Sequence, residues 1–171
     1  MRFSLLACTL LFLASPARAG AYLEPDVGFE FGSSSQDFKY TNAAETKANN
    51  SPNGLTYGAA LGYRKAMLFG AAQYEKGMGG HLSDITALGG IYLGLSTRFW
   101  LGYILSAKDE VSSGSGFKAG FGTSIGPLLC LNAEYDKRSY STYQGIAAPT
   151  LTYSGTTNSF KVTVSAPLHL F

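Results

Sequence analysis

The sequence predicts an all-β chain: eight antiparallel strands closed into a transmembrane up-and-down barrel. Three observations lead to this prediction. The chain begins with an export segment, eight segments alternate between apolar and polar side chains, and the connections between them alternate between short and long.

The first 19 residues have the form of a secretory signal peptide. Arg2 is followed by an apolar run over residues 3–14, and Ala17-Arg18-Ala19 forms a small-residue cleavage site. The run is too short to span a membrane as a helix, which takes about 20 residues. We therefore expect a cleaved signal peptide over residues 1–19 and a mature barrel domain over 20–171. Cys8 leaves lipoprotein processing as an alternative, although few apolar residues separate it from Arg2.

Composition narrows the class of protein. Cleavage removes two of the 13 Lys and Arg residues and leaves eleven, against 11 Asp and Glu, so the mature chain is neutral overall. This balance argues against a protein that binds nucleic acid through a basic face. Cys130 is the only cysteine after cleavage, which excludes an intramolecular disulfide. The 21 glycines and 22 Phe and Tyr residues are typical of membrane barrels.

Eight segments of the mature chain alternate in the manner of strands, whose successive side chains point to opposite faces. In one of them, Phe117, Ala119 and Phe121 alternate with Lys118 and a glycine. Each segment has the roughly ten residues that a tilted strand needs to cross a membrane. The predicted strands span residues 22–32, 55–64, 67–76, 85–95, 98–108, 116–126, 129–140 and 159–171.

The connections show how these strands are arranged. Those at 64–66, 95–97 and 126–128 are tight, and those at 33–54, 77–84, 109–115 and 141–158 are longer and polar. Short turns at one end and long loops at the other are typical of outer-membrane barrels, whose turns face the periplasm. We therefore expect a bacterial outer-membrane location with both termini in the periplasm.

A soluble, lipocalin-like barrel is the alternative, and its apolar face would point inward. The polar face here is rich in glycine and carries few charges of mixed sign, which suits a crowded interior better than a wet surface. Aromatic residues on the apolar face gather near the segment ends, as in an interfacial girdle. Both features favour lipid on the outside.

Several segments resemble a known group of proteins. They are Gly62-Tyr63-Arg64 before a tight turn, the glycine-rich strand over 116–126, residues 131–135, and the terminal Phe171. Together they resemble the OmpA transmembrane domain and OmpX group, with OmpW-like barrels as near neighbours. The resemblance implies eight antiparallel strands, periplasmic termini and no catalytic residues. We also expect no cofactor. The resemblance also implies recognition of Phe171 by the barrel-insertion machinery, although the apolar face of the last strand is one residue out of step with that position.

The charges on the predicted inner face are the candidate functional residues. The interior of an eight-stranded barrel is just wide enough for side chains to fill, and buried charges must be paired. We expect ion pairs that plug the lumen, with Glu134 and Arg138 near Lys118 and Lys161. A narrow channel for small or apolar solutes is the alternative. The predicted inward charges are Glu30, Arg64, Glu75, Lys108, Lys118, Glu134, Asp136, Arg138 and Lys161.

Two loop features complete the candidates. His81, Ser83 and Asp84 have a spacing similar to that in lipid A-modifying enzymes, but their predicted loop position fits a turn better than a catalytic site. The segment 140–153 is rich in Tyr, Ser, Thr and Gly, which suits contact with glycans or proteins and equally suits a solvated loop. The sequence predicts a non-enzymatic barrel that contributes to envelope integrity and surface contact. Its expected partners are outer-membrane lipids, lipopolysaccharide, the insertion machinery, and host or surface glycans and proteins.

Overall fold

The structure, a computed structural model, describes residues 19–40, 45–77, 82–94, 96–109, 111–126, 128–143 and 151–170. Within these ranges the chain forms ten strands of one antiparallel sheet. They are β1 (Gly20–Tyr40), β2 (Thr46–Asn50), β3 (Gly54–Lys65), β4 (Leu68–Gly77), β5 (Leu82–Leu93), β6 (Thr97–Asp109), β7 (Ser112–Ser124), β8 (Cys130–Tyr143), β9 (Leu151–Ser165) and β10 (Leu168–His169).

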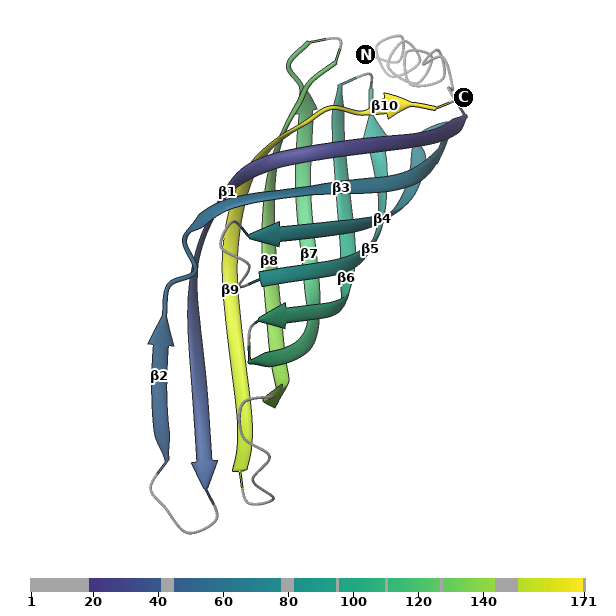
Figure 1. Ribbon diagram of the computed structural model, residues 1–171. Helices are drawn as coiled ribbons and strands as arrows, with labels where there is room; N and C mark the ends of the chain where they lie inside the picture. Colours follow the sequence, from purple (N-terminus) through teal and green to yellow (C-terminus); the bar gives the residue numbers. More distant parts are fainter. Residues whose placement is uncertain are drawn as a thin grey trace, which may run out of the picture.

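Eight of these strands make a closed wall, which confirms the predicted fold class. Each of β3 to β9 pairs with its neighbour in chain order, and β1 pairs with both β3 and β9 (Figure 1). Closure gives the backbone of the wall hydrogen-bond partners within the protein, which a lipid environment requires. The described residues include no helix of the length and apolarity needed to span a membrane.

The strands reach further into the predicted loops than expected. β1 continues to Tyr40 and pairs with β9 without interruption, as far as Tyr40 opposite Leu151. The predicted loop over 33–54 was therefore wrong, because this part of β1 also pairs with β2. The predicted loops at 77–84 and 109–115 contain the starts of β5 and β7, and that at 141–158 contains the end of β8 and the start of β9. These segments are polar, but a β ladder is built from backbone groups and tolerates polar side chains.

The longest strands form an extension at one end of the barrel. We call residues 33–40 of β1, strand β2 and residues 151–158 of β9 the extension, and the end that carries it the extension end (Figure 1). The opposite end carries β10, which pairs with Tyr22 and Leu23 of β1. Pro167 separates β9 from β10, because proline has no N–H to donate to a ladder. The signal segment over 1–18, with Cys8, lies outside the described residues, as do His81 and Phe171.

Apolar side chains cover the outside of the wall and polar ones fill its inside. Leu101 is 72% exposed and Phe117 66%, whereas Lys118 and Asp136 are buried. Monomeric soluble proteins rarely expose an apolar surface as continuous as this, while a membrane barrel needs one. On β1 and β9 the belt stops at Phe31 and Phe160, and the outward side chains beyond them are polar. This change of polarity marks one edge of the lipid-facing zone.

Register shifts interrupt part of the wall. The pairing of β5 with β6 shifts at Ile85/Thr86, that of β6 with β7 between Ile104 and Ala107, and that of β7 with β8 at Ser113/Gly114. A bulge leaves a residue unpaired and changes which later residues face inward. The pairing of β1 with β9 has no such shift.

Close strand contacts predict which glycines the wall requires. A Cβ at Gly116 would collide with the backbone of Lys137 and Arg138, whereas one at Gly89 would meet open space on the outside. We expect Gly116→Ala to lower the free energy of unfolding by about 1–3 kcal/mol, because overpacking forces the backbone to shift. The matched change Gly89→Ala should alter it by less than about 0.5 kcal/mol. Urea titration of the refolded protein, followed by heat-modifiable gel migration, measures both, and equal effects would contradict this account.

Candidate functional site

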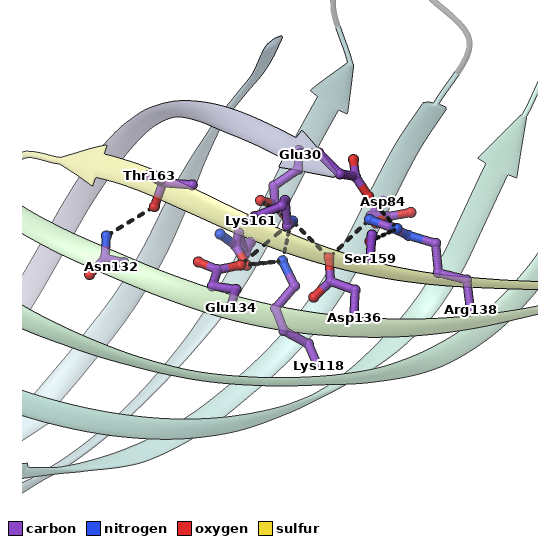
Figure 2. A network of polar contacts seen from close by, with 12 residues as sticks. Glu30, Asp84, Lys118, Asn132, Glu134, Asp136, Arg138, Ser159, Lys161 and Thr163 are labelled. Carbon is purple, nitrogen blue, oxygen red and sulfur yellow. Dashed lines mark hydrogen bonds and ion pairs between the residues drawn. The ribbon is translucent and has the colours of Figure 1, made fainter. Parts of the chain in front are cut away.

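Two lysines and three carboxylates form the centre of the lumen. The Lys161 Nζ lies 2.8 Å from Asp136 and 3.5 Å from Glu134 (Figure 2). It also lies 2.7 Å from a Glu75 oxygen. The Lys118 Nζ contacts Glu75 as well, and lies 3.1 Å from Glu134. These side chains come from β4, β7, β8 and β9. The cluster therefore ties together strands that are distant in the sequence.

Arg138 forms a second layer towards the extension end. Its Nη1 donates to Glu30 at 2.7 Å and to Ser159 at 2.8 Å, and its Nε donates to Asp84 at 2.8 Å. Its Nη2 donates to Asp136 at 3.0 Å, which joins this layer to the central one (Figure 2). All of these side chains are buried. A guanidinium suits this position because its donors point in several fixed directions at once.

A third layer lies towards the β10 end. Arg98 donates through both Nη atoms to the two carboxylate oxygens of Glu24, with Nη1 at 2.6 Å from Oε2. Its Nη2 also donates to Asn132 at 2.9 Å, and the Ser165 hydroxyl donates to Glu24 at 2.5 Å. Asn132 in turn donates to Thr163 at 3.1 Å. This bidentate pair with supporting hydrogen bonds is among the stronger forms of buried ion pair.

Aromatic side chains close the charged layers from both ends. Towards the β10 end, Tyr22, Phe69 and Trp100 form a buried cluster. Towards the extension end, Tyr140 and Tyr153 pack with Ile104 and Ala107 in another. These rings shield the charges from water, which lowers the local dielectric constant. Opposite charges therefore attract one another more strongly inside the barrel.

Two cavities inside the barrel are small. A cavity of about 30 Å³ is lined by Asp26, Gln73 and Trp100, among others, and one of about 10 Å³ lies beside Glu30 and Asp84. A single water needs roughly 10–15 Å³ of this kind of volume. Cavities of these volumes have room for only a few waters, and neither is large enough for a solute to pass.

The carboxylates of the central layer lie close enough together to be compared with a metal site. Glu75, Glu134 and Asp136 each place an oxygen within 4.8 Å of the others, a spacing that could hold a cation. The ammonium groups of Lys118 and Lys161 contact these same residues. The lysines thus supply the positive charge that a metal would otherwise bring.

The structure brings seven of the nine predicted inward charges together: Glu30, Glu75, Lys118, Glu134, Asp136, Arg138 and Lys161. Arg138 pairs with Glu30, Asp84 and Asp136, and Asp136 joins it to Lys161, which contacts the same carboxylate.

Two predicted inward charges lie outside the network. Lys108 is exposed, because the register shift between Ile104 and Ala107 reverses the faces of β6, and Ala107 takes the inward position. Arg64 lies at the rim, where its Nε donates to the Ala66 carbonyl at 3.1 Å and its guanidinium stacks 3.7 Å from the Tyr92 ring centroid. Ala66 has a φ of 55°, so Arg64 supports a strained tight turn.

Three members of the network were not predicted from the sequence. Glu24 and Arg98 could have been found by extending the inward alternation of β1 and β6 towards their first residues. Asp84 was assigned to a loop with Ser83, but both lie in β5, and Asp84 is 1% exposed and bound to Arg138. The predicted loop position of Ser83 and Asp84 was therefore wrong.

Arg138 gives the sharpest test of this site. Arg138→Met leaves Glu30, Asp84 and Asp136 without their shared cation. We expect a loss of about 3–5 kcal/mol in the free energy of unfolding, because the stranded carboxylates remain buried. Denaturant titration of the protein refolded in lipid vesicles measures this loss.

Lys137 provides the matched control, since it is the exposed, outward neighbour of Arg138 on β8. Lys137→Met should change the stability by less than about 0.5 kcal/mol. If the two variants unfolded at the same denaturant concentration, the lumen network would not contribute to stability.

Comparison with known proteins supports the fold. No family model matches the chain, and no curated protein matches it. Among solved structures, a de novo designed transmembrane β-barrel has a TM-score of 0.50 at 10% identity, over 89% of this chain and 99% of its own. Neisserial surface protein A has a TM-score of 0.49 at 17% identity, over 86% of this chain and 96% of its own. Outer membrane protein OprG from Pseudomonas aeruginosa has a TM-score of 0.43 at 12% identity, over 90% of this chain and 98% of its own. The closed wall and the similarity to the designed barrel give the chain the fold of a small eight-stranded transmembrane barrel, the architecture that bacterial outer membranes contain.

Proposed function

We propose that this chain is a non-enzymatic barrel of a bacterial outer membrane, with a plugged lumen, which contributes to envelope integrity. The filled lumen is the observation that supports this function most directly. Three layers of buried ion pairs lie between two aromatic clusters, and the two small cavities within them have room for only a few waters. Such a barrel reinforces a membrane without opening it.

We further propose that the extension end faces the cell surface and the β10 end faces the periplasm. In outer-membrane barrels the longer loops project from the cell surface, and the short turns lie in the periplasm. The extension carries exposed polar side chains on its outer face, including Ser33, Ser35 and Lys47. It is therefore the part of the chain available for surface contact.

The competing functions find less support. A narrow channel needs a continuous path, whereas Lys118, Lys161 and Arg138 each lie across the lumen in ion pairs.

A lipid A-modifying enzyme centred on Ser83 needs a carboxylate to orient its histidine. Asp84 is buried and already bound to Arg138. Mass spectrometry of lipid A from cells with and without the gene should show no difference.

Bilayer recording tests the plug. The refolded protein should give no large, stable conductance across a planar lipid bilayer. A variant with serine in place of all five central charges, Glu75, Lys118, Glu134, Asp136 and Lys161, removes the central layer and keeps Arg138 paired with Glu30 and Asp84. We expect this variant to conduct ions more readily than the unaltered protein and Lys137→Ser to remain closed. A large, stable open conductance in the unaltered protein would refute the plugged lumen.

Cell assays test the role in the envelope. Deletion of the gene should increase sensitivity to bile salts and to large antibiotics, because the membrane loses a sealed structural component. Expression of the unaltered chain should restore resistance, whereas the five-serine variant should not, provided that both reach the membrane in equal amounts. Unchanged sensitivity after deletion would contradict the proposed role.

A further inference from the structure

A polar groove lies on the outer face of the extension. It has a volume of about 620 Å³ and is lined by Ser33, Ser35, Asn49, Thr156 and Asn158, among others. The groove is open to the surroundings and is formed by β1, β2, β9 and the segment that follows β2.

Backbone register places these side chains on one face. Ser33 lies opposite Asn158 and Ser35 opposite Thr156 on β9, and Ser35 also lies opposite Asn49 on β2. The side wall is held in place by Asn53, whose Oδ1 accepts a hydrogen bond from the Gly32 N–H at 3.1 Å. The groove is thus fixed between two ladders and a tethered turn.

The groove adjoins the lipid belt directly. Phe31 and Phe160, the last apolar residues of the belt on their strands, lie two positions from Ser33 and Asn158 on the same outward faces. The Tyr135 hydroxyl, on the belt, donates to the Asn158 side chain at 3.0 Å. A lipid whose acyl chains lie against Phe31 and Phe160 therefore presents its headgroup to the groove.

The lining selects the chemistry of that headgroup. Hydroxyl and amide side chains both donate and accept hydrogen bonds, which suits the hydroxyl groups of a sugar. The lining contains no Lys or Arg, which a phosphate would favour, and no large apolar side chain. The nearest charges on these strands lie further out, where Lys47 pairs with Asp37 at 4.0 Å.

We infer that this groove binds the sugar headgroup of a glycolipid held in the same membrane. The inference rests on the proposed function, which places the extension at the cell surface, where the outer leaflet of such a membrane carries glycolipid. It assigns a site and a lipid class to the extension, which otherwise has only a general role in surface contact.

Nanodiscs containing the refolded protein test this inference. One set holds lipopolysaccharide with its core sugars, and the other holds only phosphatidylethanolamine. After a detergent wash, mass spectrometry counts the lipid molecules that remain with each barrel. We expect lipopolysaccharide to be retained and phosphatidylethanolamine to be lost. Equal retention of both lipids would show that the sugar is not recognised and would overturn the inference.

Two variants locate the binding. Ser35→Phe fills the groove and should lower lipopolysaccharide retention by about tenfold, whereas Thr156→Val removes one hydroxyl at constant shape and should lower it by about two- to fivefold. Ser141→Phe makes the same steric change on the exposed face of β8, outside the lining, and is the control. Heat-modifiable migration confirms that each variant is folded. Equal retention in Ser35→Phe and Ser141→Phe would overturn the inference.

A soluble competitor distinguishes the source of the sugar. Core oligosaccharide released from its lipid should displace lipopolysaccharide poorly, because it lacks the acyl chains that hold the headgroup beside the groove. Efficient displacement would point to free glycans as the ligand and would contradict a membrane source. The discs carry glycolipid in both leaflets, so this result does not depend on orientation in cells. The retention assay can therefore contradict glycolipid binding while the proposed envelope function stands. The conductance and cell assays can likewise contradict the envelope function while glycolipid binding stands.

Discussion

The pairing of charge inside the closed wall is the constraint on which the rest of this structure depends. A buried charge is costly unless an opposite charge and further hydrogen bonds compensate it. Arg138 illustrates the solution, because it meets three carboxylates and a serine hydroxyl from four strands. Each of those strands must be in register for the pairing to occur. The closed barrel thus brings each of these carboxylates within reach of a buried cation.

This constraint also explains how the two faces of the wall divide their tasks. The apolar belt of the outward face contributes little specific recognition, since Leu101 and Phe117 need only contact lipid. The inward face carries the geometric information, because the aromatic clusters and the ion pairs must fit one another. Glycines on that face make room for large neighbours, as Gly120 does beside the Trp100 ring. A polar interior in an apolar exterior inverts the usual arrangement of a soluble protein, and the lipid solvent accounts for it.

The sequence allowed the strands and their inward faces to be predicted wherever alternation was unbroken. It failed where backbone geometry decides the outcome. Strict alternation from Gly102 predicts that Lys108 faces inward, and only the register shift in β6 reveals that it faces outward. The glycines before His81 predict a loop at Asp84, yet backbone pairing with β6 and the ion pair to Arg138 place it in a strand. The partners of each charge depend on which strands lie opposite across the lumen, and a single sequence does not encode that directly.

The three register shifts have a consequence for how such a chain can vary. They lie on neighbouring pairs of strands, from β5 to β8, and each absorbs a change in residue count before the chain reaches the extension end. Insertions or deletions beyond them leave the inward positions of the central layer in phase. Over this half of the wall, the residues at the extension end can therefore change in number while the central layer keeps its register. The uninterrupted ladder of β1 and β9 has no such buffer, so a one-residue change there would invert every side chain beyond it.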